Sequence, residues 1–231
     1  RYRRRLARFD QMTEEVLKYL ALQKRLNARS PLKEGVRVLP VTKTVEPARI
    51  LPLKDAGAAE IGENRVQEAL EKLPLLKGAF GIRIIGRLQT NKARYVARIA
   101  SAVESLDRIE LADALQRALD REDRALDVLI EVNAGNDPAK AGVAPEELKQ
   151  FLRAASAYDR LRVRGLMTVA PIAPDPELVR PCFRRMRRLF EDFGAGEWDT
   201  LSMGMSADCD VAAEEGATQV RAGSAIFGKR N

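Results

Sequence analysis

Residues 36–44, with the sequence VRVLPVTKT, form an apolar, β-branched run that reaches Lys43. Such a run predicts a buried strand over residues 36–42. A lysine at the carboxyl end of a strand can reach a pocket above a parallel sheet, where its amine can form a Schiff base with an aldehyde. The alternative is that Lys43 is a solvated lysine that only ends the strand. The rest of the chain has to decide between these two interpretations of Lys43.

Outward from this strand, short apolar runs alternate with helical patterns along the chain. Residues about 3–28 predict a long amino-terminal helix. Strands are predicted at residues 36–42, 58–61, 82–85, 102–105, 126–132, 163–167, 200–203 and 219–222. Helices are predicted at residues 47–56, 66–73, 91–99, 109–120, 176–193 and 208–215, with one more opened by Pro145 and a last one opened by Gly223 and Ser224.

Eight strands that alternate with helices predict parallel pairing through right-handed crossovers. Eight such units close into a (β/α)8 barrel of the TIM type, here preceded by the long helix. An open doubly wound sheet is the alternative, and the lack of a dinucleotide-binding glycine motif disfavours it. The length of 231 residues suits one domain spanning residues 1–231.

The composition excludes several classes of protein. The chain has no histidine, which excludes metal sites and catalytic pairs that need one, and we expect no bound metal. Its two cysteines, Cys182 and Cys209, fall in helical patterns and indicate a reducing, cytoplasmic setting. The sequence contains no run of 18 apolar residues, so no membrane span is predicted.

The net charge of +7 raises the possibility of nucleic-acid binding. Positive charge gathers in residues 1–8 and at Arg180, Arg184, Arg185, Arg187 and Arg188. Aromatic residues make up only 5% of the chain and no RNA-binding motif is present. Solvated helix faces therefore explain the charge better than a nucleic-acid site does.

In a barrel of this type, chemistry takes place at the carboxyl ends of the strands. The residues predicted at these ends are Lys43, Asn64, residues 86–89, Asn133, Met167, residues 202–206 and residues 221–224. No carboxylate pair is expected among them, so glycosidase chemistry is not supported.

Two of these segments suit a phosphate group. Residues 202–206, SMGMS, join the seventh strand to a helix that Ser206 could cap, and Gly223 and Ser224 follow the eighth strand. Loops at these two strands form the recurrent phosphate site of barrels. Together with Lys43 they suggest an aldehyde-bearing phosphate ester, of which pyridoxal phosphate (PLP) is the common one.

Arg221 lies one step before the second segment. A guanidinium facing the pyridine nitrogen of PLP would keep that nitrogen unprotonated and the ring a poor electron sink. The alternative is an ion pair with Glu214 or Glu215 outside the barrel.

Seven stretches taken in order resemble the pyridoxal phosphate homeostasis protein family, which is similar to the amino-terminal barrel of alanine racemase. They are VTKT (41–44), GENRVQE (62–68), IGRLQTNK (85–92), SLDR (105–108), GLM (165–167), LSMGMSAD (201–208) and VRAGSAIFG (220–228). The resemblance covers residues from about 38 to 228. It implies a barrel that holds PLP and keeps it available and harmless, without an established catalytic activity.

The family pattern implies a role for each matching residue. It implies the Schiff base on Lys43, the pyridine nitrogen against Arg221, and the phosphate against Ser206, Gly223 and Ser224 with Ser202 close by, while Asn64 and Met203 line the ring. The chain departs from the pattern at four places. It has Arg83-Ile84 where an aromatic-His pair is common, and Arg65 where Tyr is frequent. It has Ser224 where Thr is usual, and Lys140-Ala141-Gly142 where Lys-Ser-Gly is usual.

Two functions remain open. The favoured one is a monomeric cytoplasmic protein that binds PLP reversibly and passes it to apo-enzymes through transient contacts. The other is a PLP-dependent amino-acid racemase or lyase, which needs acid/base groups on both faces of the ring. The tyrosines fall in helical patterns, and we expect no second domain after Gly228 to supply such a group.

Overall fold

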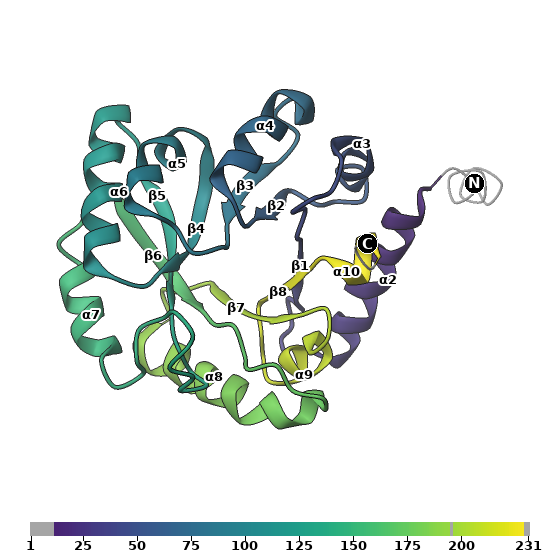
Figure 1. Cartoon of the computed structure of the whole chain (residues 1–231). Helices are drawn as coiled ribbons and strands as arrows, with labels where there is room; N and C mark the ends of the chain where they lie inside the picture. Colours follow the sequence, from purple (N-terminus) through teal and green to yellow (C-terminus); the bar gives the residue numbers. More distant parts are fainter. Residues whose placement is uncertain (1–11, 195, 229–231) are drawn as a thin grey trace.

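The computed structural model describes residues 12–194 and 196–228, in which eight parallel strands surround one axis and helices lie outside them (Figure 1). The strands are β1 (Arg37–Pro40), β2 (Glu60–Glu63), β3 (Gly81–Ile84), β4 (Ala100–Leu106), β5 (Leu126–Glu131), β6 (Leu161–Met167), β7 (Thr200–Met205) and β8 (Gln219–Ala222). The helices are α2 (Glu14–Arg29), α3 (Pro47–Ile50), α4 (Val66–Leu76), α5 (Ala93–Ile99), α6 (Ile109–Glu122), α7 (Leu148–Ala155), α8 (Arg180–Gly194), α9 (Cys209–Glu214) and α10 (Ser224–Phe227). Three short 3-10 helices are η1 (Leu51–Leu53), η2 (Thr90–Lys92) and η3 (Pro176–Val179).

The strand order β1-β8-β7-β6-β5-β4-β3-β2 is that of a barrel. The seam between β1 and β2 closes through one parallel bridge, between Val41 and Gly62. The amide of Thr42 donates to the Gly62 carbonyl at 3.0 Å across the same seam. The (β/α)8 prediction is therefore confirmed, with a barrel that is nearly closed, and the open-sheet alternative is excluded.

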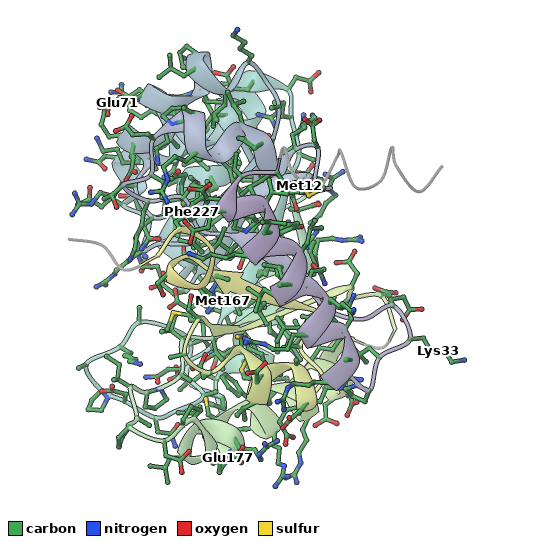
Figure 2. The ribbon with its side chains drawn as sticks, turned by 90° about the vertical axis from the view of Figure 1, so that its right-hand side faces the viewer. Met12, Lys33, Glu71, Met167, Glu177 and Phe227 are labelled. Carbon is green, nitrogen blue, oxygen red and sulfur yellow. The ribbon has the colours of Figure 1, made fainter. Side chains whose placement is uncertain are left out.

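Helix α2 confirms the described part of the predicted amino-terminal helix. It begins at Glu14, where the Thr13 hydroxyl accepts from the Val16 amide at 3.4 Å, and the part predicted before residue 12 lies outside the described residues. Figure 2 shows α2 crossing the outside of the barrel next to Phe227 of α10. The helix thus covers the outer side of the barrel where the first and last strands meet.

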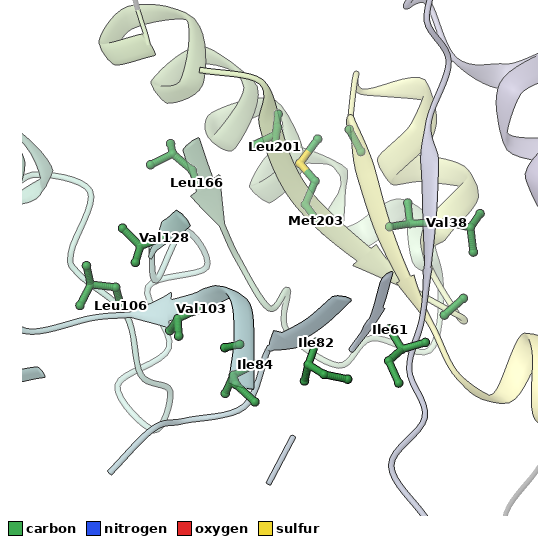
Figure 3. Close-up of a cluster of buried hydrophobic side chains, with 14 of the residues drawn as sticks. Val38, Ile61, Ile82, Ile84, Val103, Leu106, Val128, Leu166, Leu201 and Met203 are labelled. Carbon is green, nitrogen blue, oxygen red and sulfur yellow. The ribbon is translucent and has the colours of Figure 1, made fainter. Parts of the chain in front are cut away.

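Apolar side chains on the outward faces of the strands form one layer against the helices. Val38, Ile82 and Leu201 belong to this layer (Figure 3). Their neighbours Arg37, Arg83 and Thr200 belong to the opposite strand faces, as alternation requires, and line a cavity at the amino end of the barrel. The outer layer is apolar, and several of the inward-facing positions are charged.

The boundaries differ from prediction where turns take up residues. Strand β2 begins two residues later than predicted, because the amide of Ala58 still bonds the Leu53 carbonyl at 3.0 Å and holds the chain in the preceding turn. Pro145 opens a turn, and the helix after it begins only at Leu148. Within residues 12–194 and 196–228, the helices lack the combination of length and apolar character needed to cross a bilayer.

Candidate functional site

A cavity of about 660 Å³ lies at the carboxyl ends of the strands. It is lined by Val41, Lys43, Asn64, Ile85, Val169, Met205, Ser206, Ala207, Arg221, Gly223 and Ser224. Six of the eight residues proposed from sequence are among them, and Ser202 and Met203 are not. The volume is in the range of small-molecule sites, and the place is where barrels bind ligands.

Lys43 is half-buried in a tight turn after β1. The next residue, Thr44, has a φ of 60°, a left-handed conformation that is strained for a β-branched side chain. Two bonds fix this turn: the Thr44 amide donates to Glu68 Oε1, and Lys72 Nζ donates to the Thr42 carbonyl at 2.5 Å. The backbone on both sides of Lys43 is therefore held by side chains from α4.

Glu63 completes this support below the turn. Its side chain is fully buried, and its Oε1 accepts from Thr42 Oγ1 at 2.5 Å and from Lys72 Nζ at 2.9 Å. Its Oε2 has no partner among the described residues. Burial raises the pKa of Glu63, and the bonds from Thr42 and Lys72 oppose that rise. Lys72 is thus the cation that lies against this buried carboxyl group and favours its charged form.

Asn64 follows β2 and lines the same cavity as Lys43 and Ser206. Its backbone lies against Gly86, at which a Cβ would come within 2.4 Å of the Asn64 carbonyl oxygen. Only glycine fits at this close approach, so Gly86 after β3 sets the position of Asn64.

Ser206 joins the two loops predicted to bind phosphate. It is not the cap of α9, as the sequence suggested, because that helix begins at Cys209 with Asp208 at the cap position. The Ser206 hydroxyl oxygen accepts from the amides of Gly223 at 3.3 Å and Ala225 at 3.2 Å. Two backbone donors therefore converge on one oxygen at the rim of the cavity, an arrangement that suits an oxygen of a phosphate group.

Arg221 points into the barrel, and its side chain lies at the bottom of the cavity. Its Nη1 donates to Ser202 Oγ and its Nη2 to the Thr168 carbonyl, both at 2.7 Å. The alternative partners outside the barrel, Glu214 and Glu215, instead accept from arginines of α2 and α8. Ser202 therefore acts below the cavity, as a support for Arg221.

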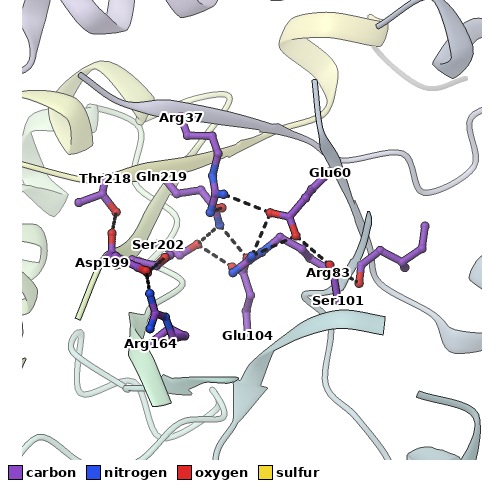
Figure 4. Close-up of polar contacts among 12 residues, drawn as sticks. Arg37, Glu60, Arg83, Ser101, Glu104, Arg164, Asp199, Ser202, Thr218 and Gln219 are labelled. Carbon is purple, nitrogen blue, oxygen red and sulfur yellow. Dashed lines mark hydrogen bonds and ion pairs between the residues drawn. The ribbon is translucent and has the colours of Figure 1, made fainter. Parts of the chain in front are cut away.

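A polar network fills the barrel beneath this site (Figure 4). Glu104 is fully buried and accepts from Ser202 Oγ at 2.6 Å, Gln219 Nε2 at 2.7 Å and Arg83 Nε at 2.6 Å. Burial acts to raise the pKa of Glu104, but the charges of Arg83 and Arg221 outweigh burial and the pKa lies below its usual value. The unusual Arg83 thus supplies a counter-charge inside the barrel.

Met203 does not line the cavity, contrary to the sequence-based expectation for the ring. Strand side chains alternate, and Ser202 points inward, so Met203 points outward into the apolar layer, where it is fully buried (Figure 3). Met205, two residues further on, lines the cavity and is 38% exposed. Alternation along β7 predicts the outward position of Met203, but it does not predict that of Met205, which lies beyond Gly204 (φ 89°) and an irregularity in the register with β8.

Two carboxylates lie at the ends of β4 and β5, where the sequence predicted no such pair. Burial and the negative charge of Asp107 raise the pKa of Glu131 to about 7, and the charges of Arg221 and Arg87 oppose the rise. Neither carboxylate is among the residues that line the cavity. The expectation of no paired carboxylates at the strand ends was therefore wrong, although the pair stands apart from Lys43.

Other predicted groups take structural places. Lys140 Nζ donates to the Ala170 carbonyl at 2.6 Å, which ties the loops after β5 and β6 together outside the cavity lining. Cys182 and Cys209 are buried free thiols on helices, and burial raises the pKa of both. Among the arginines of α8, Arg180, Arg184, Arg185 and Arg187 form ion pairs with carboxylates.

Comparison with known proteins agrees with this fold. Residues 17–231 match the family model described as alanine racemase, N-terminal domain. The chain is 43% identical to the pyridoxal phosphate homeostasis protein of Aquifex aeolicus, over 84% of this chain and 87% of that protein, and 38% identical to that of Pseudomonas aeruginosa, over 88% and 87%. The chain belongs to the pyridoxal phosphate homeostasis protein family.

A solved structure agrees with this membership. The structure of PipY from Synechococcus elongatus with PLP bound superposes with a TM-score of 0.79 at 32% identity, covering 89% of this chain and 99% of PipY. The resemblance drawn from the sequence motifs is confirmed at the level of the family and the fold.

Proposed function

We propose that this protein binds PLP in the cavity at the carboxyl ends of its strands, holds it as a Schiff base on Lys43, and releases it to apo-enzymes. The observation that carries the proposal is the presence of Lys43, the Ser206–Gly223 rim and Arg221 around one cavity. The names of the relatives and the PLP bound to PipY support the same ligand.

The donor set of the cavity fits the cofactor. The amides of Gly223 and Ala225 and the hydroxyls of Ser206 and Ser224 would hold the phosphate group, with Ser206 turning from acceptor to donor. Apolar walls come from Val41, Ile85, Val169 and Met205, and Asn64 adds an amide. These walls suit a flat ring whose polar groups lie at its edges.

Arg221 favours storage over catalysis. Its guanidinium has donors and no acceptor, so a ring nitrogen facing it would stay unprotonated. PLP supplies an electron sink when that nitrogen carries a proton. Within the described residues, no carboxylate, tyrosine or thiol lines the cavity to move a proton at a substrate carbon. We therefore propose a homeostatic role without robust catalysis, in a cytoplasmic monomer.

Borohydride reduction tests the proposal. The protein loaded with PLP should absorb as an imine, and reduction should fix the cofactor to the peptide that contains Lys43. Lys43→Ala should abolish the fixation while thermal unfolding stays close to that of the parent. Fixation to Lys92 or Lys140 instead would refute the assignment.

A second experiment separates storage from catalysis. The loaded protein is incubated with L-alanine in heavy water, and deuterium at the α-carbon is followed by NMR. We expect no exchange beyond the background of free PLP. Exchange at about 1 s⁻¹ or faster, a rate typical of enzymes, would restore the racemase or lyase alternative.

A further inference from the structure

A second cavity, of about 690 Å³, lies beside the first at the same end of the barrel. Its lining residues follow β2, β3 and β4: Asn64, Arg65, Val66, Gln67, Arg87, Leu88, Gln89, Thr90, Lys92 and Arg108. Asn64 lines both cavities, so the two adjoin. Apart from Asn64, none of these lining residues has a part in the proposed handling of PLP on Lys43.

The second cavity carries an excess of positive charge. Four cations line it, and no carboxylate is among the described lining residues. Within the described residues Arg65, Arg87 and Lys92 form no ion pair, and only Arg108 does, with Asp107. Cations gathered around one hollow repel each other and create a positive potential that attracts an anion.

A cavity at the other end of the barrel provides the contrast. Arg37, Arg83 and Arg164 line it, yet carboxylates from the same lining neutralise them. Glu60 pairs with Arg37 and Arg83, and Asp199 pairs with Arg164. The arginines of that cavity are therefore neutralised by carboxylates of its own lining, whereas Arg65 and Arg87 of the second cavity are not, within the described residues.

Neutral donors in the second cavity add to the cations. The first-turn residues Val66 and Gln67 of α4 line it, and the residue before them, Arg65, makes no side-chain cap bond to the helix. The side chains of Gln89 and Thr90 are exposed at the rim. A planar guanidinium matches two oxygens of a phosphate at once, so this donor set suits a phosphate dianion better than a single carboxylate.

We propose that the second cavity is an anion site that binds the phosphate group of a small phosphate monoester next to the Lys43 cavity. The ester could be a second molecule of PLP on its way in or out, or an unrelated phosphate ester. Both would present the same dianionic group to Arg65, Arg87 and Lys92.

NMR titration with glycerol 3-phosphate tests the site independently of Lys43. We expect the amides of Val66 and Gln67 to shift on titration. The double variant Arg65→Gln/Arg87→Gln should bind at least about tenfold more weakly, because it loses two charge-assisted contacts. Both arginines are exposed, so the variant should fold as the parent does.

Arg188→Gln is the matched control. This exposed arginine lies on α8, across the barrel from α4, and forms no ion pair within the described residues (Figure 1). It removes one positive charge without touching the cavity, and binding should stay within about twofold. Absence of shifts at Val66 and Gln67 up to about 10 mM ester, or equal weakening in the control and the double variant, would overturn the proposal.

A second arm identifies the source of the phosphate. Protein already saturated with PLP and reduced is titrated with further PLP and, separately, with glycerol 3-phosphate. Tighter binding of PLP at the amides of Val66 and Gln67 supports the site as a second cofactor site, and equal binding supports a general phosphate site. The same experiment on Lys43→Ala should leave these shifts intact, whatever happens at the first cavity.

Discussion

Replacing Lys72 should destabilise the protein through the turn that carries Lys43. Lys72 Nζ lies 2.9 Å from Glu63 Oε1, 2.6 Å from Glu68 Oε1 and 2.5 Å from the Thr42 carbonyl oxygen. Its side chain is only 9% exposed, and that of Glu63 is fully buried. Lys72→Met keeps most of the packed chain and removes only the ammonium group.

The magnitude follows from what the variant leaves behind. Glu63 already has one unpartnered buried oxygen and a pKa raised by burial. Removing the partner of a buried ion pair costs about 3–5 kcal/mol, since the remaining charge is uncompensated. For a chain of this size that corresponds to a fall in Tm of roughly 6–20 °C. The strained Thr44 backbone loses support as well, because Glu68 loses its cation.

Urea denaturation of three variants measures this effect. Lys72→Met/Glu63→Gln should regain at least half of the loss, because the glutamine is neutral and still accepts from the Thr42 hydroxyl. Lys54→Met is the control, since Lys54 is exposed and, among the described residues, donates only to the Ala79 carbonyl. It should cost less than about 1 kcal/mol. A cost of Lys72→Met as small as that of the control, or a double variant no better than the single one, would refute the reasoning.

Three further predictions address the cavity and the network beneath it. Ser206→Ala should weaken PLP binding about tenfold and leave pyridoxal binding unchanged, as measured by absorbance titration, and tighter PLP binding would contradict the role of the hydroxyl. Glu131 has a pKa of about 7 in the folded protein, against about 4.3 in the unfolded chain, so folding favours its protonated form. The stability that this carboxyl group contributes is fully present below about pH 4 and is lost as the pH rises through about 7. Glu131→Gln should therefore gain about 3 kcal/mol at pH 8 and little at pH 4 in urea denaturation, and an equal change at both values would exclude titration as the cause. Glu104→Gln should cost about 3–5 kcal/mol, because Arg83 and Arg221 lose a buried counter-charge, and a thermal melt unchanged from the parent would contradict it.

The fold was predictable because each local pattern agrees with the global one. Strand β8 was predicted at residues 219–222 and lies there, since a short strand confined between Gly216 and the Gly223-Ser224 turn has little room to shift. The start of β2 was not predicted correctly, because the turn hydrogen bond between Ala58 and Leu53 depends on tertiary position and leaves no periodic signal in the sequence. Pro145 misled for a related reason, since proline suits turns as well as helix starts.

The candidate site was predictable where residues sit at strand ends and not where they act from elsewhere. Lys43 and Arg221 could be proposed because the strand order alone brings them to one cavity. Met203 was misplaced because the alternation along β7 was not applied to it. Glu104 could not be found, since its partners Arg83, Ser202 and Gln219 are distant in sequence and only the closed barrel brings them together.

The charged interior of the barrel links the position of Arg221 to residues far from the cavity. Arg37 at the amino end donates to Gln219 at 2.5 Å, Gln219 donates to Glu104, and Glu104 accepts from the Ser202 hydroxyl that receives Arg221. Each of these groups satisfies the next, so none can be replaced without leaving a buried polar atom unpaired. The outer apolar layer supplies burial, and the inner polar network fixes the guanidinium at the bottom of the cavity.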